Sequence, residues 1–405
     1  MFARLIPANS VLRIQTYRRI FISRFISNLG NGIAPIALAF GVLAIPGTDA
    51  TSLSIVLAAQ AIPLILVLPF GGVIADRLGR ARVIAASDTV LGVVVMAIAV
   101  LFFTESATVL SLAILGAVAG CLNGLWWPAY AGMVPDAVEN EFLQPANAYL
   151  SIASNGGLIL GSAIGGVLVA LFGPGVAVAI DATSFLVSAW LIFTIRHIAK
   201  PHHSGESMMG DLAEGWRVFI SYRWVVVIVA AFSVVLLAGR GALEVLGPVL
   251  AVDHYGGAAG WSAVLACQSL GLLLGALLVS KLQVKRPMVF AMSLTFALPV
   301  LLIFLSLALP LWLIAVAALC LGISYESLGI LWFTALQRHI PRESLSRVSA
   351  YDAMGSLMLG PLGLALAGPL AAAIGLQGAF LIAAAVAFLA IAASLAAPSV
   401  WKLRA

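Results

Sequence analysis

Residues 71–83 read Gly-Gly-Val-Ile-Ala-Asp-Arg-Leu-Gly-Arg-Ala-Arg-Val, a short charged stretch between two long apolar runs. An apolar run of roughly 20 residues is long enough to cross the hydrocarbon core of a bilayer as a helix. The stretch is therefore expected to form a turn between two membrane-spanning helices. Opposite charges at such a turn can hold two helix ends together and can also release them. The candidate residues of this gate are Gly72, Asp76, Arg77, Gly79, Arg80 and Arg82.

The composition of the whole chain excludes an ordinary soluble protein. Of its 405 residues, 62% are hydrophobic and only 9% are charged, whereas soluble domains carry about 25% charged residues. The expected fold class is an all-α polytopic membrane protein with twelve transmembrane helices. The predicted spans are 18–43, 52–75, 83–103, 107–130, 146–171, 175–195, 224–248, 259–281, 286–306, 311–335, 347–372 and 376–397.

One long polar connection divides the predicted spans into two sets of six. We expect an N-terminal six-helix bundle at 1–195, a cytoplasmic linker at 196–223 and a C-terminal six-helix bundle at 224–405. An internal repeat supports this division, because residues 126–135 align with residues 332–341. Repeats of this kind are typical of transporters built from two pseudo-symmetric halves.

The repeat continues into the next span and includes a degenerate copy of the charged stretch. Gly173 aligns with Gly375 at an offset of 202 residues. In the second copy of the charged stretch, residues 276–286, Ser280-Lys281 stands where Asp76-Arg77 stands in the first. The acidic residue of the gate is therefore expected in the N-terminal half only.

The distribution of basic residues predicts the orientation. All Lys and Arg residues except Arg24 and Arg240 fall in the termini or in alternate connections. By the positive-inside rule, both termini are expected in the cytoplasm, in the inner membrane of a bacterium. The net charge of +5 is then explained by contact with anionic membrane lipids rather than nucleic acid.

The spacing Gly-x-x-x-Asp-Arg-x-Gly-Arg-x-Arg of residues 72–82 resembles the signature loop between helices 2 and 3 of the major facilitator superfamily. Segments such as YRRIFISRFIS and ALQRHIPRESLSRVSAY are similar to its enterobactin-exporter-like branch, which borders the drug:proton antiporter-3 family. This resemblance implies export of amphipathic small molecules by alternating access. One departure is Gly30-Asn31, where related drug exporters often carry Gly-Asp.

A run of glycines in the fifth predicted span has two interpretations. It resembles the antiporter motif of the superfamily, although the usual Gly-Pro reads Gly161-Ser162 here. Glycines four residues apart also let a neighbouring helix approach closely, without any further role. The residues concerned are Gly157, Gly161, Gly165 and Gly166.

Polar residues inside the spans are candidates for the substrate or proton pathway, because charge at membrane depth is costly unless it is paired or functional. Arg240 and Glu244 are four residues apart and can form an ion pair on one helix face. Asp181 either lines a cavity or contacts a neighbouring helix. Arg24 either joins a polar stripe or extends to the membrane surface. The pathway residues are predicted to be Asn28, Asn31, Asp181, Arg240, Glu244 and Glu326, with Glu326 as the proton carrier.

Five further residues receive structural interpretations. Asp88 and Asp352 lie near predicted cytoplasmic helix ends, so we expect them to join the loop charges around Arg80, Arg82 and Arg347. Trp126, Trp127 and Trp332 are expected first in the aromatic belt at the membrane interface, and second as stacking surfaces for a substrate.

The sequence contains no phosphate-binding loop, so ATP hydrolysis, enzymatic activity and a cofactor are not expected. The leading hypothesis is a proton-coupled efflux transporter for amphipathic small molecules such as drugs. The alternatives are a dedicated exporter of a siderophore, lipid or metabolite, and a membrane sensor or assembly factor that transports nothing.

Overall fold

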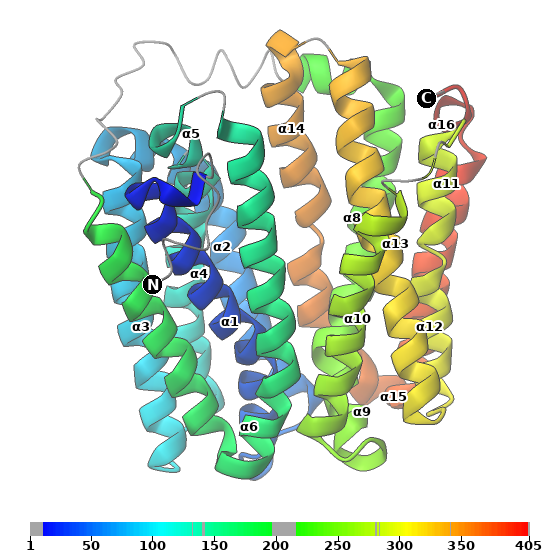
Figure 1. Ribbon diagram of the computed structural model, residues 1–405. Coiled ribbons are helices and arrows are strands. Elements are labelled where there is room, and N and C mark those ends of the chain that lie inside the picture. The colour runs from blue at the N-terminus through cyan, green and yellow to red at the C-terminus, as the bar shows by residue number, and fades with distance from the viewer. Residues whose placement is uncertain are drawn as a thin grey trace. The chain divides into compact units, whose positions relative to one another are not determined.

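The computed structural model describes residues 11–131, 133–139, 142–196, 216–279, 282, 284–340 and 342–403. For some of these residues inside helices only the backbone is described, at positions 69, 72, 73, 76, 131, 135, 143, 144, 147, 148, 342–347 and 350. Every regular element within the described residues is helical (Figure 1).

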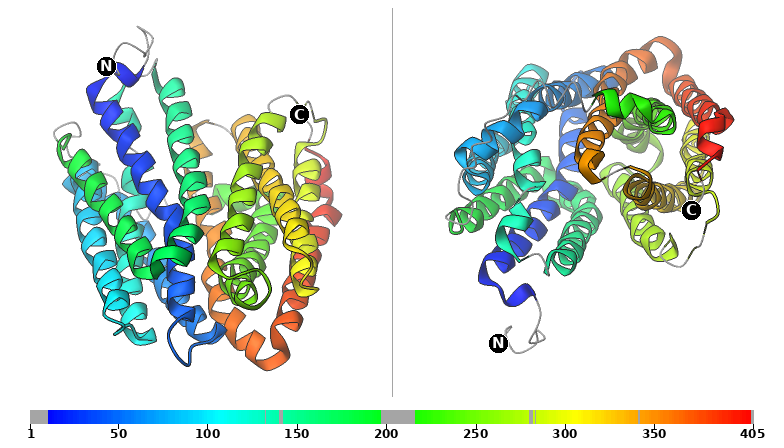
Figure 2. Two further views of the ribbon diagram at one scale, coloured as in Figure 1. Left: turned by 60° about the horizontal axis from the view of Figure 1, so that its bottom comes forward. Right: turned by 90° about the horizontal axis from the view of Figure 1, so that it is seen from above.

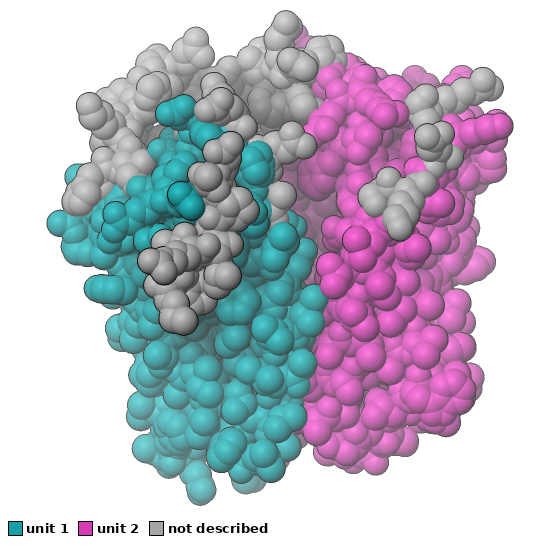
Figure 3. All heavy atoms as spheres, viewed as in Figure 1, with its two compact units in different colours: residues 1–46, 59–204 teal, residues 47–58, 205–405 magenta. Residues whose placement is uncertain are grey.

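Two compact units make up the chain (Figure 3). Unit 1 comprises Met1–Pro46 and Ala59–Ser204, and unit 2 comprises Gly47–Ala58 and Gly205–Ala405. The predicted linker at 196–223 stays a prediction, because residues 197–215 lie outside the description.

The helices follow one another in a simple order along the chain (Figure 1). The first half contains η2 (Val11–Arg13), α1 (Gln15–Leu43), α2 (Ala50–Leu78), α3 (Arg80–Phe103), α4 (Val109–Ala131), α5 (Met133–Ala137) and α6 (Leu143–Phe193). The second half contains α8 (Arg223–Arg240), the π-helix η4 (Gly241–Leu246), α9 (Gly247–His254), α10 (Ala258–Val279), α11 (Pro287–Leu294), α12 (Ala297–Ser306), α13 (Leu311–His339), α14 (Arg342–Leu357), α15 (Gly360–Ala396) and α16 (Pro398–Trp401).

Ten helices among the described residues are long and apolar enough to cross a membrane. Two of them are too long for one crossing, since their apolar parts span 45 and 46 residues, or about 70 Å as straight helices against a hydrocarbon core of about 30 Å. Each of these two helices breaks at a glycine with φ of 80°, Gly173 in α6 and Gly375 in α15. Counting each broken helix as two crossings is consistent with the predicted twelve.

The two breaks lie at positions that the sequence repeat relates to each other. A φ of 80° is unfavourable for residues with a Cβ, whereas glycine adopts it readily. Nothing lies within 4 Å of a Cβ placed on either Gly173 or Gly375, so backbone conformation and not packing accounts for both glycines. The first break falls between the predicted spans 146–171 and 175–195.

In unit 1, α1 packs along α6, and the two helices stay side by side in both further views (Figure 2). The contact uses the glycine run of α6. A Cβ on Gly157 would lie 2.5 Å from the carbonyl oxygen of Phe25, and one on Gly161 would overlap the carbonyl oxygen of Leu29. A Cβ on Gly165 would lie 3.1 Å from the side chain of Ile36. Small residues therefore bring the two backbones into direct contact.

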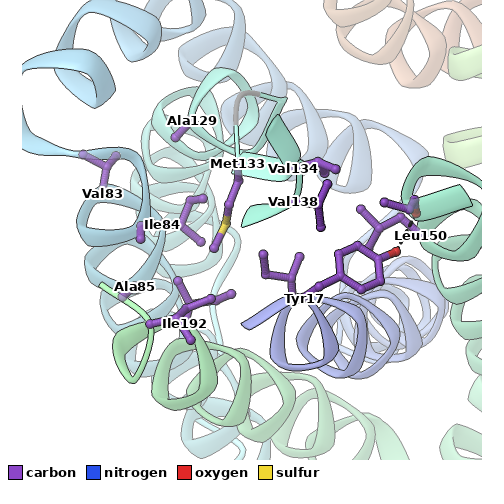
Figure 4. Close-up of a cluster of buried hydrophobic side chains, with 14 of the residues drawn as sticks. Tyr17, Val83, Ile84, Ala85, Ala129, Met133, Val134, Val138, Leu150 and Ile192 are labelled. Atoms are coloured by element: carbon purple, nitrogen blue, oxygen red, sulfur yellow. Dashed lines mark hydrogen bonds between the residues drawn. The ribbon is translucent and has the colours of Figure 1, made fainter. Parts of the chain in front are cut away.

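A cluster of buried side chains joins one end of α1, α3, α4, α5 and α6 (Figure 4). Met133, Val134 and Val138 from the α5 region pack there with Ile84 and Tyr17. The Tyr17 hydroxyl donates a hydrogen bond of 2.5 Å to the carbonyl of Ala146. This cluster anchors the charged turn between α2 and α3, because Ala75 and Ala81 on either side of the turn belong to it.

In unit 2, α8 and η4 pack against α15, while α10 packs against α13. Glycines again allow close approach. A Cβ on Gly363 of α15 would overlap the carbonyl oxygen of Leu237, and one on Gly271 of α10 would overlap that of Leu319. Both units therefore contain glycine-mediated helix pairs beside their clusters of buried side chains.

The contact between α1 and α6 can be tested with single methyl groups. Gly161→Ala should lower the melting temperature of the detergent-purified protein, because overpacking a tight contact typically costs about 1–3 kcal/mol. Gly156→Ala is a matched control on the same helix, since its Cβ would meet only the Phe25 ring at 3.8 Å. Equal melting temperatures for the two variants would contradict this packing.

Candidate functional site

The turn between α2 and α3 is built around Gly79. Its φ of 93° is favourable only for glycine, and it directs the chain into α3 at Arg80. The Arg80 guanidinium forms an ion pair with Asp136 of α5, with Nη1 3.1 Å from Oδ2 and 3.3 Å from Oδ1. The two side chains are 32% and 28% exposed, so water screens the pair and its contribution to stability is small.

Asp136 is a partner of Arg80 that sequence reasoning missed. The predicted partner was Asp76, whose side chain lies outside the described part of the structure, as does the environment of Gly72. Arg77 and Arg82 are exposed. The described pair connects the start of α3 to the segment that follows α4, so it joins three consecutive spans at one end of unit 1.

The predicted polar stripe of α1 lies at its contact with α6. Asn28 is buried, and its Oδ1 accepts a hydrogen bond of 3.4 Å from Nδ2 of Asn31. The Nδ2 atom of Asn28 has no hydrogen-bond partner within the described residues. Of the glycines in the antiporter-like run, Gly157 approaches the Cβ of Asn28, and Gly166 is buried in the same helix.

A second polar cluster in unit 1 was not predicted. The Asp88 carboxylate of α3 is 1% exposed and accepts a hydrogen bond of 2.6 Å from the Ser188 hydroxyl of α6. Ser188 also lies 2.8 Å from the Ser23 hydroxyl of α1. The other oxygen of Asp88, Oδ1, has no partner within the described residues. A buried carboxylate is thus connected by hydroxyl groups to two neighbouring helices.

Arg24 lies beside this cluster and supplies positive charge. Its Nε donates a hydrogen bond of 2.8 Å to Ser154, and its guanidinium lies 5.1 Å and 4.6 Å from the ring centres of Trp126 and Tyr130. Those two rings stack on each other. The side chain interacts electrostatically with Asp88. Arg24 therefore joins a polar stripe and does not extend to the membrane surface.

The expectation that Asp88 joins the loop charges of Arg80 and Arg82 was wrong. Position along the helix suggested a surface residue, but Asp88 faces α6, where the Ser188 hydroxyl donates a hydrogen bond to one of its two oxygens. A sequence signal was available in retrospect: Ser184 and Ser188 share one face of α6 at a spacing of four residues, as do Ser23 and Ser27 on α1. Such hydroxyl pairs indicate that polar groups meet between the helices.

Asp181 is a further buried polar residue of unit 1. It is 3% exposed, and its Oδ1 has no hydrogen-bond partner among the described residues. A Cβ placed on Gly30 of α1 would overlap this carboxylate and the hydroxyl of Ser184. Asp181 was expected either to line a cavity or to contact a neighbouring helix, and the structure shows contact with helix α1. Gly30 provides the space that the carboxylate occupies.

In unit 2 the expected ion pair between Arg240 and Glu244 is present. Nε lies 2.7 Å from Oε1, and Nη2 lies 3.0 Å from Oε2, so the contact is bidentate. Both side chains keep about a third of their surface accessible, at 33% and 38%. Glu244 lies in η4, and short π-helical turns inside α-helices are frequent at functional sites. Gly360 of α15 leaves room for the Arg240 side chain.

Glu326 is half-buried on α13. It packs near Gly275 of α10, where an added Cβ would lie 3.1 Å from the Glu326 Cβ. Within the described residues it forms no ion pair and no hydrogen bond through its side chain. Among the described residues no cation pairs with its carboxylate, whereas that of Glu244 is paired with Arg240.

The expectation for the tryptophans was wrong in two cases. Trp126 and Trp332 are 9% and 8% exposed, so they are core residues and not part of an interface belt. Trp332 donates a hydrogen bond of 2.8 Å to Asp352, which also accepts one of 3.2 Å from Ser356. Asp352 is therefore satisfied inside unit 2, and the side chain of its expected partner Arg347 lies outside the description.

The interaction free energy between the Arg24 and Asp88 side chains can be measured with a double-mutant cycle. Arg24→Gln should lower stability by about 1–3 kcal/mol, because it removes a charged hydrogen bond to Ser154 and a cation that interacts electrostatically with the buried Asp88 carboxylate. Adding Asp88→Asn should recover part of this loss. Arg19→Gln, which removes a hydrogen bond to the Thr194 carbonyl, should show no coupling to Asp88→Asn. Additive effects of Arg24→Gln and Asp88→Asn on thermal stability would contradict the pairing.

Comparison with known proteins assigns the family. Residues 20–361 match the sequence profile of the Major Facilitator Superfamily. The chain is 30% identical over 371 residues to the multidrug efflux pump Tap of Mycolicibacterium fortuitum, covering 87% of this chain and 88% of that protein. It is 26% identical over 362 residues to the enterobactin exporter EntS of Escherichia coli O1:K1 / APEC, covering 86% and 85% of the two chains.

Solved structures agree on the fold. A bacterial homologue of the iron transporter ferroportin, in its inward-facing state, superposes with a TM-score of 0.73 at 14% identity, covering 96% of this chain and 100% of that one. The nucleoside transporter NupG superposes with a TM-score of 0.72 at 14% identity, covering 96% and 99%. The chain therefore belongs to the major facilitator superfamily and is an integral membrane transporter with that family's fold of two pseudo-symmetric six-helix bundles.

Proposed function

We propose that this transporter exports amphipathic small molecules such as drugs across the bacterial inner membrane in exchange for protons. The likeness to the multidrug efflux pump Tap, over 87% of this chain, supports the substrate class. A dedicated exporter of a siderophore is the second candidate, supported by the likeness to the enterobactin exporter EntS. A non-transporting sensor or assembly factor is not retained, because the chain belongs to a transporter family.

The observation that supports proton coupling is a set of carboxyl groups inside the spans whose oxygens lack hydrogen-bond partners among the described residues. Asp88 and Asp181 each have a buried Oδ1 without a partner in the described residues, and the Glu326 carboxylate is likewise unpaired there. A charged carboxylate at membrane depth is costly. Binding a proton neutralises the group and supplies a donor, so protonation and conformation are expected to depend on each other.

In the proposed cycle the two halves, 1–195 and 224–405, expose the pathway alternately to the cytoplasm and to the outside, connected by the linker at 196–223. Both termini face the cytoplasm, as the positive-inside distribution of Lys and Arg predicts. Asn28, Asn31, Asp181 and the pair Arg240–Glu244 contribute polar contacts to substrate or proton movement. The turn containing Asp76 and Arg80 controls the cytoplasmic side.

The gate can be tested at its described ion pair. Asp136→Asn should change stability by less than about 1 kcal/mol, since both partners are partly exposed, but it should slow transport in proteoliposomes. The reversed pair Arg80→Asp with Asp136→Arg should restore part of the rate, and Asp76→Asn should slow transport as well. Glu139→Gln removes a neighbouring exposed acid and serves as the control. Normal transport by well-folded Asp136→Asn and Asp76→Asn proteins would refute the gate.

Proton coupling can be tested by imposing a pH gradient on proteoliposomes and following cationic dyes, macrolides and siderophores. Glu326→Gln should reduce gradient-driven export about tenfold or more, equivalent to about 1.4 kcal/mol, while downhill exchange persists. Asp181→Asn and Asp88→Asn test the other two carboxyl groups. Glu105→Gln alters an acid in the exposed connection between α3 and α4 and should have no effect.

The outcomes separate the candidates. If Glu326→Gln exports normally against the gradient while Asp181→Asn or Asp88→Asn does not, the proton carrier lies in unit 1. If none of the three variants alters the response to pH, the transporter is not coupled to protons. Export of siderophores with no export of dyes or macrolides would favour the dedicated exporter.

A further inference from the structure

Unit 2 contains a cavity of about 580 Å³ at the end where α10 and α13 terminate and α11 begins. Its walls combine two kinds of side chain. Val279, Ile330 and Leu331 are apolar, whereas Lys285, Arg338 and His339 are basic. An apolar cavity with clustered basic groups fits a ligand that is itself amphipathic and anionic.

The positive charge of this cavity is not compensated within the described residues. Neither Lys285 nor Arg338 forms an ion pair there. The His339 ring is held in place, with Nδ1 3.0 Å from the Ala335 carbonyl and its ring edge-on to Trp224. Two cations without an ion-pair partner among the described residues, at one largely apolar cavity, form a site for an anion.

The internal repeat explains how this site arose. In unit 1 the equivalent turn carries Arg80, which pairs with Asp136. At the offset of 206 residues defined by Trp126 and Trp332, the sequence position of Asp136 corresponds to Arg342. Asp76 is likewise replaced, by Ser280. The second copy has lost both acids, so neither repeat-related position supplies an anion for Lys285 or Arg338.

The position of the cavity indicates a lipid as the source. The positive-inside pattern predicts that this end faces the cytoplasm, where anionic lipids attract basic residues. Leu278 and Leu282 beside the cavity are 50% and 49% exposed, which offers an apolar surface to an acyl chain. We propose that the cavity binds the phosphate of an anionic phospholipid through Lys285 and Arg338, with acyl carbons against Val279, Ile330 and Leu331.

A simpler role for two of these residues has to be separated from lipid binding. Arg338 and His339 lie in the last turn of α13, where cations stabilise a helix by offsetting its dipole. That role requires no ligand. It predicts that Arg338→Gln lowers the melting temperature equally with and without lipid, whereas the proposal predicts a loss of the lipid-dependent increase.

The test uses the delipidated, detergent-solubilised full chain and does not depend on transport. Phosphatidylglycerol should raise the melting temperature and stay bound in native mass spectrometry, while phosphatidylcholine with the same acyl chains should do neither. Lys285→Gln and Arg338→Gln should each weaken phosphatidylglycerol binding about fivefold. Arg338→Lys keeps the charge and should retain most of the phosphatidylglycerol binding. This variant serves as the test if the Arg338→Gln protein fails to fold.

Arg286→Gln is the matched control, because it removes one charge from the same connection but its guanidinium lies 5.1 Å over the Trp401 ring, outside the cavity. If Arg286→Gln weakened phosphatidylglycerol binding as much as Lys285→Gln or Arg338→Gln, the lipid would be attracted by the overall positive charge and not by this cavity, and the proposed site would be wrong. Stabilisation by inorganic phosphate as large as that by phosphatidylglycerol would overturn the lipid and indicate a soluble phosphate ligand. Unchanged binding in both Lys285→Gln and Arg338→Gln would overturn the proposal altogether.

Discussion

The low dielectric of the bilayer is the constraint on which the rest of this structure depends. In a hydrocarbon core every polar group must be satisfied within the protein or neutralised. The backbone meets this requirement by forming helices, and the side chains meet it by gathering at helix contacts. Asp88 with Ser188, Arg240 with Glu244 and Asp352 with Trp332 are three solutions to the same problem. In Asp181 one carboxylate oxygen has no hydrogen-bond partner within the described residues, so its burial carries a cost that the described contacts do not offset.

Helix α1 combines packing with polar chemistry in unit 1. Its backbone touches α6 through glycines, since a Cβ on Gly161 would overlap the Leu29 carbonyl. The same close approach brings the Ser23 hydroxyl of α1 to Ser188 of α6 and leaves room beside Gly30 for Asp181. The antiporter-like glycines and the polar cluster are therefore parts of one interface. A change in the distance between α1 and α6 would alter the environment of both carboxylates.

The two halves retain a common backbone but have diverged in their polar groups. Both contain a glycine break with φ of 80° at repeat-related positions, Gly173 and Gly375. Trp126 and Trp332 are also related, yet the first lies beside Arg24 and the second donates to Asp352. Backbone features persist because they determine where the chain turns. Side-chain chemistry can change in one half without altering where the chain turns.

The sequence by itself determined the membrane class, the spans, the turn at Gly173 and the pairing of Arg240 with Glu244, because hydropathy and a spacing of four residues are local properties. It did not determine which helices meet. Asp136 as the partner of Arg80, Asp88 facing Ser188, and the burial of Trp126 and Trp332 depend on contacts between residues far apart in the chain. Helix ends near the cytoplasm suggested surface positions for Asp88, whereas rotation of the helix about its axis decided its burial. Only tertiary packing sets that rotation, since it depends on where glycines allow a neighbouring backbone to approach.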